Sequence, residues 1–217
     1  MPQPEVAIAI AIRGLGDRAD EPKDPMDQMD PMEPGGRQPA PGRLARVQEF
    51  VNTVDVEDGV DQLADPERLG AWLAERELLG RGERLGAADL QRAVEVREAL
   101  RGLLLANAGA DLDPEAVASL NRSARNARLL VRFGDDGRAG LEPEPAGVEQ
   151  AVARLLAIVY TAMAEGTWAR LKACRNHECR WAFYDHSKNR SGRWCTMDVC
   201  GNAMKARAYR SRQRPRR

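Results

Sequence analysis

The first 167 residues of this 217-residue chain contain neither histidine nor cysteine; both histidines and all four cysteines come later. A thiol nucleophile, a Ser–His pair and the usual zinc ligands are therefore excluded from that part of the chain. Its carboxylates are scattered, and Glu95 and Glu98 stand among Arg92, Arg97 and Arg101, which predicts surface ion pairs. Because no phosphate-binding loop is present either, we expect no enzyme.

The chain also lacks a run of about 18 apolar residues, the length needed to cross a membrane. Its apolar run at residues 6–12 has no basic residue before it and acidic residues after it, which does not fit a signal peptide. We therefore expect a cytoplasmic protein. In that reducing compartment, paired cysteines indicate metal ligands rather than disulfides.

The formal net charge is zero, but the charges are segregated along the chain. Residues 168–217 carry 14 Lys and Arg against 3 Asp and Glu, whereas the first 167 residues carry 19 against 30. A basic end of this kind is typical of proteins that bind a polyanion such as nucleic acid. The alternative is that the two parts of the chain simply attract each other.

Composition divides the chain into three parts. Residues 1–42 are rich in proline, glycine and acidic residues and cannot bury enough apolar surface, so we expect a disordered tail without function. The apolar run within it could be a stray strand or lie upstream of the true start. Residues 43–167 are predicted to form a mainly helical domain, and residues 168–217 a small cysteine-containing module.

Apolar periodicity and capping signals define the elements of the helical part. Asp65-Pro66 and Asp113-Pro114 each place a capping carboxylate before a proline at the first helical position. Asn52, Thr53 and Asp55 end the first predicted helix, and capping explains them about as well as ligand binding does. We expect helices at about 43–54, 66–79, 87–107, 114–127 and 148–166, and a β-hairpin of residues 129–133 and 138–141 around the turn signal at 135–137.

The four cysteines form two pairs of equal spacing, Cys174 with Cys179 and Cys195 with Cys200, separated by fifteen residues. Two such loops supply the two edges of a thiolate tetrahedron, the geometry that zinc prefers. The spacer is long enough for a hairpin, with strand character at residues 180–185. Because four thiolates leave zinc no open position, we expect a structural Zn²⁺ ion without catalytic chemistry.

Redox-active pairs, buried free thiols and an iron–sulfur cluster are the alternatives to zinc. His177 lies within the first loop and could replace one cysteine as a ligand, although we expect an exposed loop residue there.

After Cys200, alanines and long side chains predict a helix that ends by Pro215. Met204 and Ala208 would pack toward the metal, and basic side chains would share another face. Such a helix can follow phosphates or enter a major groove. The predicted nucleic-acid contacts are Arg193, Lys205, Arg207, Arg210, Arg212 and Arg214.

These motifs resemble a known protein family. The first cysteine pair followed by Arg180-Trp181, then residues 193–197 (RWCTM), then Cys200-Gly201-Asn202 and a basic helix, resemble the CGNR zinc finger. Residues 50–55 (FVNTVD), with an aspartate and a tryptophan after them, resemble the start of the ABATE domain, which precedes this finger in bacteria.

The resemblance implies a mainly α fold with a small β-hairpin, in which a helical domain precedes a treble-clef-like finger. It also implies a transcription regulator that binds double-stranded DNA, with a helical domain that senses a small molecule or mediates a homodimer. The family's arginine after Gly-Asn is Ala203 here, and if that arginine braces the finger, Lys205 or Arg193 could substitute. The alternative is a module that binds protein or RNA, the latter through aromatic side chains such as Trp181 and Trp194.

Overall fold

The computed structural model describes residues 38–144 and 146–213. Most of the predicted disordered tail, including the apolar run at 6–12, lies outside the described residues, as does Arg214. No helix in the described part of the chain is long and apolar enough to cross a membrane. The elements, in order, are α1 (Leu44–Val51), β1 (Val54–Asp55), β2 (Val60–Asp61), α2 (Pro66–Glu75), α3 (Ala87–Asn107), α4 (Pro114–Ala127), β3 (Leu129–Phe133), β4 (Ala139–Pro143), α5 (Val148–Ala164), η2 (Trp168–Arg170), β5 (Leu171–Ala173), β6 (Ala182–Tyr184), η3 (Met197–Gly201) and α6 (Asn202–Gln213).

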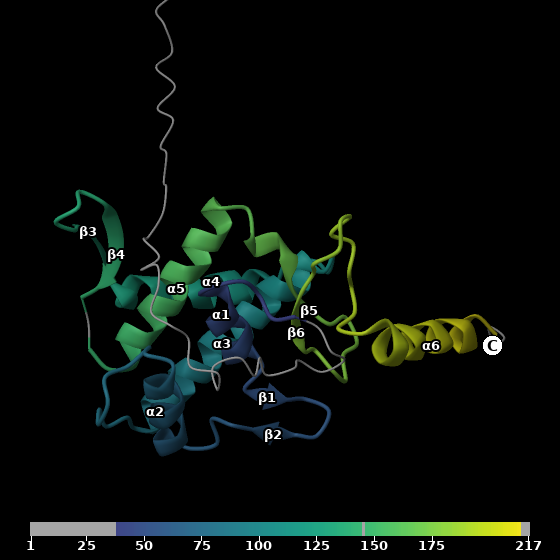
Figure 1. Ribbon diagram of the computed structural model, residues 1–217. Helices are drawn as coiled ribbons and strands as arrows, with labels where there is room; N and C mark the ends of the chain where they lie inside the picture. The colour runs from purple at the N-terminus through teal and green to yellow at the C-terminus, as the bar shows by residue number, and fades with distance from the viewer. Residues whose placement is uncertain (1–37, 145, 214–217) are drawn as a thin grey trace, which may run out of the picture.

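Helix α3 is the centre of the fold, and α1, α2, α4, α5 and β5 all pack against it (Figure 1). Its Leu100 and Leu104 are fully buried in one apolar core with Phe50 of α1 and Leu155 of α5. The crossing of α3 with α4 is close, because a Cβ added to Gly102 would stand 2.9 Å from the Cβ of Ala116. The mainly α fold with small hairpins agrees with the sequence prediction.

The two Asp-Pro signals cap helices as predicted. Asp65 accepts a hydrogen bond from the backbone N–H of Arg68 at 2.8 Å, and Asp113 accepts one from that of Glu115 at 2.9 Å. Each carboxylate satisfies one of the backbone N–H groups that a helix start leaves without a partner.

The hairpins differ in part from the prediction. Strands β3 and β4 pair antiparallel from Leu129 opposite Pro143 to Phe133 opposite Ala139, so the expected hairpin is present. The hairpin of β1 and β2 was not expected. Helix α1 ends at Val51 and not at residue 54 as predicted, and β1 begins at Val54. The expectation of a hairpin within the spacer between the cysteine pairs is wrong. β6 instead pairs with β5, upstream of the first pair.

The β5–β6 hairpin lies against the helical core. Leu171 and Ala173 of β5 and Ala182 and Tyr184 of β6 belong to the same buried cluster as the side chains of α1, α3 and α5. The side-chain amide of Asn52 completes the edge of β6: its Nδ2 donates to the Ala182 carbonyl at 2.9 Å, and its Oδ1 accepts from the Ala182 N–H at 2.7 Å. Asn52 is the C-terminal cap residue of α1, as one of the two interpretations predicted, and its side chain joins the helical part to the hairpin.

Arg97 and Arg101 form ion pairs as expected, but the two arginine side chains are buried and do not lie on the surface. Both pair with Glu98, but the two arginines are only 4% and 1% exposed. Arg97 also binds both carboxylate oxygens of Asp61, at 2.8 and 2.9 Å. Arg101 donates to the carbonyls of Val51 and Arg180, at 2.5 and 2.9 Å. These guanidinium groups are buried because they satisfy backbone and carboxylate acceptors that secondary structure leaves unpaired.

We expect Asn52→Ala to lower the free energy of unfolding by about 2 kcal/mol, because it leaves the buried N–H and carbonyl of Ala182 without their partner. Chemical denaturation followed by circular dichroism measures this change. Asn121→Ala removes the same amide from the exposed face of α4 and should change stability by less than about 0.5 kcal/mol. Equal effects of the two substitutions would contradict the role given to Asn52.

Candidate metal centre

The four cysteines come together in space, although two segments separated by fifteen residues supply them. Their sulfur atoms all lie within 4.8 Å of one another, and the Sγ atoms of Cys179 and Cys200 each lie 3.6 Å from that of Cys195. A disulfide would require about 2.05 Å. Four thiolates at about 2.3 Å from a tetrahedral zinc ion lie about 3.8 Å apart. The observed spacing therefore fits a metal ion and not a cystine pair.

The thiols are electrostatically coupled. Side-chain hydrogen bonds from Cys179 and Cys195 lower the pKa of Cys174, and the backbone N–H groups of Cys195 and Asn176 lower it further. The same contact with Cys174 raises the pKa of Cys179 and of Cys195. Four thiolates in so small a space require a cation to offset their negative charge. This is the electrostatic condition of a metal ligand set.

The first pair sits at the turn of the β5–β6 hairpin. Cys174 follows β5 directly, and Cys179 precedes Arg180, whose φ of +51° lets the chain turn back into β6. The side chain of Asn176 is buried in this turn, and its Nδ2 lies 3.6 Å from the Sγ of Cys200. Such a donor stabilises a thiolate and links the first pair to the second.

The second pair comes from a different kind of structure. Cys195 lies in the loop after residue 192, and Cys200 lies in the wide helical turn η3, which leads directly into α6. Thr196 caps this turn through a hydrogen bond from the Val199 N–H to its Oγ1 at 3.4 Å. The arrangement of a hairpin turn facing a helix start is treble-clef-like, as predicted. His177 is 65% exposed and does not belong to the sulfur cluster.

A buried ion pair beside the cluster holds the loop that carries Cys195. Lys172 and Asp185 are almost fully buried and lie 2.7 Å apart, Nζ to Oδ2. Lys172 also donates to the carbonyls of Arg190 and Gly192, and Asp185 accepts from the Gly192 N–H at 2.7 Å. Burial raises the pKa of Asp185, but the hydrogen bonds from Lys172 and Ser187 outweigh this effect and lower it.

This pair was not predicted. Its only sequence signal is a lysine within one short apolar strand and an aspartate directly after another, and charged residues at such positions are common on solvent-exposed strands.

Helix α6 extends away from the rest of the molecule (Figure 1). Of the predicted nucleic-acid contacts, Lys205 and Arg210 are exposed on this helix, and Arg193 is exposed on the loop before Cys195. The side chain of Arg212 is not among those described. The predicted contacts therefore flank the sulfur cluster and continue along the helix.

Arg207 differs from the other predicted contacts. Its guanidinium forms an ion pair with Glu178 in the first cysteine loop and lies 3.5 Å from the Oδ1 of Asn176. The hydrogen bond from Arg207 also lowers the pKa of Glu178. Arg207 lies one helical turn after Ala203, so it braces α6 against the cysteine loop on the side where the family's arginine would stand. Neither Lys205 nor Arg193, the predicted substitutes, makes this contact among the described residues.

Three aromatic side chains of the module pack around the sulfur atoms, whereas Tyr209 is exposed on α6. Phe183 is buried in the same cluster as the cysteines, and Trp181 and Trp194 pack against it. Tyr184 faces the helical core. These rings cover the site from water, which leaves them poorly placed to stack on unpaired bases.

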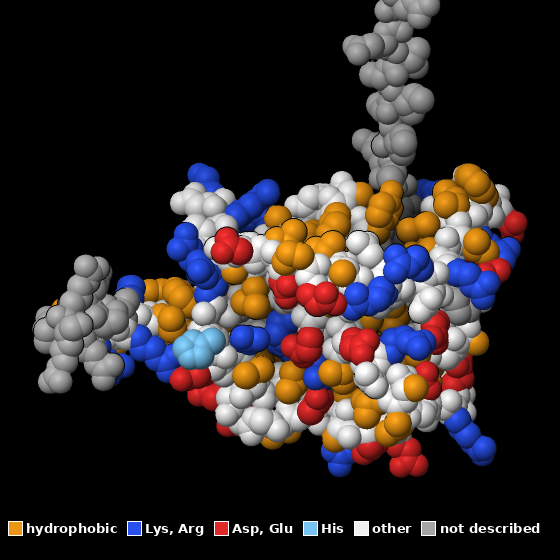
Figure 2. All heavy atoms as spheres, turned by 180° about the vertical axis from the view of Figure 1, so that it is seen from behind, with side chains coloured by type: hydrophobic (Ala, Val, Ile, Leu, Met, Phe, Trp, Pro, Cys, Tyr) orange, Lys and Arg blue, Asp and Glu red, His pale blue; other side chains and the backbone are white. Residues whose placement is uncertain are grey.

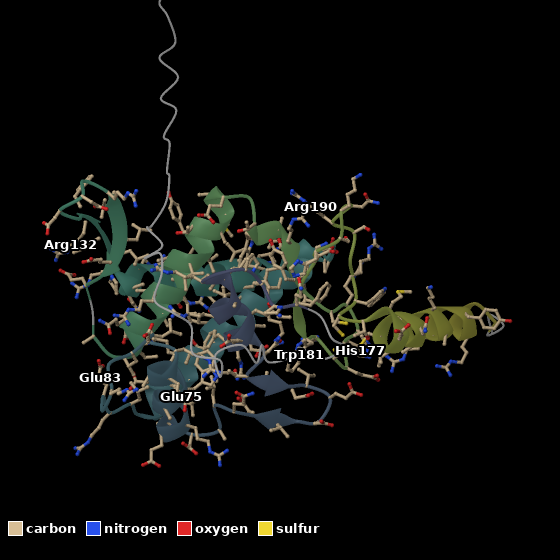
Figure 3. The ribbon with its side chains drawn as sticks, in the orientation of Figure 1. Glu75, Glu83, Arg132, His177, Trp181 and Arg190 are labelled. Atoms are coloured by element: carbon tan, nitrogen blue, oxygen red, sulfur yellow. The ribbon has the colours of Figure 1, made fainter. Side chains whose placement is uncertain are left out.

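The surface around the module is basic. Figure 2 shows Lys and Arg side chains gathered near the base of α6, whereas basic and acidic side chains are mixed over the helical part. An open depression of about 550 Å³ lies beside the second pair and is lined by Arg193, Trp194 and His186 among others. Figure 3 shows Arg190 near the end of the neighbouring loop and His177 beside the start of α6.

Two family models match the chain. The CGNR zinc finger model matches residues 170–213, and the ABATE model, described as "Putative stress-induced transcription regulator", matches residues 44–166. Neither describes an enzyme family. No curated protein is significantly similar to this chain.

We expect Asp185→Asn to lower the free energy of unfolding by about 3 kcal/mol at neutral pH, because the buried Lys172 ammonium loses its counter-charge. The folded pKa of Asp185 lies below its unfolded value of about 3.9, so its contribution is complete above that pH and is lost as the pH falls further. Denaturation curves of wild type and variant should therefore differ strongly at pH 7 and converge in acid. Asp198→Asn, at an exposed acid of the same module, should lower neither the stability at pH 7 nor its dependence on pH.

Proposed function

Because this chain belongs to the ABATE family and carries its domain before a CGNR zinc finger, we propose that it is a zinc-dependent, DNA-binding transcription regulator. The observation that carries the proposal is the position of the sulfur cluster at the base of an exposed basic helix. The cluster fixes where this helix begins. The helix then presents cations that have no acidic neighbours along it.

We assign zinc as the ion and Cys174, Cys179, Cys195 and Cys200 as its ligands. The fit is supported by sulfur–sulfur distances of 3.6 Å, by burial of three of the four thiols and by the Asn176 amide beside Cys200. Zinc would supply a rigid cross-link here and no chemistry, since four thiolates fill its coordination sphere. The helix and hairpin on either side are too small to hold each other without it.

We assign the DNA contact to Lys205 and Arg210 of α6 and to Arg193 of the preceding loop. Arg212 and Arg214 extend the same basic run and are predicted contacts from the sequence alone. Arg207 acts mainly as the brace that sets the angle of the helix, since Glu178 already neutralises it. The body of the protein is acidic, so it repels phosphates and leaves the basic end as the surface that meets DNA.

The helical domain would then be the part that receives a signal, from a small molecule or from a second subunit. An open depression of about 750 Å³ lies between α2 and the loop of residues 80–85 and offers room for a small molecule. A cytoplasmic location is consistent with this role and with four free thiols.

Binding of RNA or protein is the alternative function. Because Phe183, Trp181 and Trp194 pack against the sulfur cluster, we favour duplex DNA. Competition between duplex DNA and single-stranded RNA of equal length separates the two, and stronger binding of RNA would decide against DNA.

Purified protein should contain about one zinc per chain, measured by elemental analysis. Cys195→Ser should lose the metal and loosen the finger, which limited proteolysis of the module detects, while α3 and its neighbours remain folded. His177→Ala is the matched control, because His177 lies in the first loop but outside the sulfur cluster, and it should retain the metal. Iron in place of zinc, or metal loss in the histidine variant, would overturn the assignment.

Binding to duplex DNA should be detectable at about 50 mM salt and weaken steeply by about 200 mM, because each neutralised phosphate adds about 0.9 to the slope of log affinity against log salt. The double substitution Lys205→Ala with Arg210→Ala should lower that slope by about 2. Fluorescence anisotropy with labelled duplex measures both quantities.

The matched control is Arg84→Ala, which removes an exposed arginine from a loop of the helical part and should leave the slope unchanged. An affinity that does not respond to salt, or an equal effect of all these arginine and lysine variants, would exclude the assigned surface.

A further inference from the structure

The β3–β4 hairpin projects from the end of the molecule opposite α6 (Figure 1). Helix α5 packs against β4, so β3 is the outer strand of the hairpin. The proposed DNA-binding surface makes no use of this hairpin, and its exposed side chains require a separate explanation.

The backbone of β3 offers hydrogen-bonding groups along its outer edge. Hydrogen bonds from the Glu144 N–H to the Arg128 carbonyl and from the Gly134 N–H to the Arg138 carbonyl fix the alternation of the hairpin. In an antiparallel pair, every second residue bonds its partner strand, and the residues between direct their N–H and C=O groups outward. For β3 the outward residues are Leu129, Val131 and Phe133.

The same three residues place their side chains on one face of the hairpin, because side chains alternate along a strand. Two of them are largely exposed: Val131 at 62% and Phe133 at 74%. The one charged residue of β3, Arg132, lies on the opposite face, where it pairs with Glu142 at 3.2 Å. Figure 2 shows hydrophobic side chains at this end of the molecule.

Edge strands of folded proteins are normally protected by charge, proline or a covering segment. The other edge of the hairpin is protected in this way, since α5 packs against β4 and Pro143 in β4 has no N–H to offer. β3 has none of these protections on its outward residues. An edge that is both apolar and open is suited to pairing with another strand.

We propose that β3 pairs antiparallel with β3 of a second copy of this chain, about a two-fold axis at Val131. This register places Val131 opposite Val131 and Leu129 opposite Phe133, so the outward backbone groups of both strands meet partners. The apolar faces of the two hairpins become continuous. A self-complementary strand of this kind selects a second copy over an unrelated protein.

The charges at the two ends of β3 favour the same arrangement. Asp135 follows the strand in the turn, and Arg125 precedes it in the last turn of α4. Both are exposed, and neither has an ion pair among the described residues. Antiparallel pairing brings Asp135 of one copy toward Arg125 of the other at both ends of the interface.

The paired strands alone form a small interface. Stable complexes bury about 1,200–2,000 Å² in total, and a pair of five-residue strands falls below this range. We therefore expect a dimer with a dissociation constant on the order of 10 µM.

Analytical ultracentrifugation without DNA tests the proposal, using the full chain loaded with metal between about 1 and 200 µM. The wild type should change from monomer to dimer across this series. Val131→Lys should remain monomeric throughout, because it sets two like charges opposite each other at the axis. Val131→Pro should also remain monomeric, because proline has no N–H to donate to the second copy. The hydrogen bonds between β3 and β4 stay intact, since the N–H of Val131 points outward.

Val60→Lys is the matched control. Val60 is an exposed valine, 60% accessible, on the separate β1–β2 hairpin, and this substitution should leave the dimer unchanged. Circular dichroism shows whether each variant is folded.

A wild type that stays monomeric at every concentration, or folded Val131 variants that dimerise like the wild type, would overturn the proposal. Because no DNA is present, neither result bears on the proposed DNA binding.

Discussion

Alternation of side chains along β5 and β6 lets one short hairpin serve two cores. Leu171, Ala173 and Ala182 point into the helical core, whereas Phe183 on the other face packs among the four cysteines. Neither core would be complete without the hairpin. A segment of some fifty residues with few apolar side chains cannot bury enough surface to fold alone, so it depends on the sulfur cluster, with the metal proposed for it, on one face and on α1, α3 and α5 on the other.

This shared hairpin makes the finger a fixed extension of the helical part. Asn52 binds the backbone of β6, and Arg101 reaches from α3 to the carbonyl of Arg180, the residue directly after Cys179 of the sulfur cluster. A shift of α1 against α3 would therefore move the first cysteine loop. Because Arg207 of α6 forms an ion pair with Glu178 in that loop, a movement of the loop would also move α6. The contacts form a continuous physical route from the helical core to the basic helix, which the proposed signal-dependent regulator would use.

The sequence predicted those features whose signals are local. Asp65-Pro66 and Asp113-Pro114 mark helix starts because the cap and the proline lie within one turn of each other, and the β3–β4 hairpin follows from a turn signal between two short runs. The equal spacing of the cysteines predicted their cluster for the same reason: each pair spans a single loop.

Features that depend on distant partners were missed or misread. Arg101 has the spacing of an ordinary surface arginine on α3, and only its contacts with residues 51 and 180 explain its burial. The role of Asn52 depends on Ala182, 130 positions away. Strand β6 was found, but its partner was misplaced, since the sequence does not show that the strand before the first cysteine pair would reach back across that loop.

The positions of the two outer surfaces constrain how they could act together. The hairpin and α6 lie at opposite ends of the molecule (Figure 1). A domain of this size measures roughly 40 Å across, so pairing through β3 would separate two copies of α6 by about twice that length. One turn of DNA is only about 34 Å. Two such helices could not occupy adjacent turns of a straight duplex. Binding of one dimer to two half-sites would require half-sites more than one turn apart, or DNA that curves around the dimer. In either arrangement, a weak protein dimer would bind DNA strongly only where both half-sites are present.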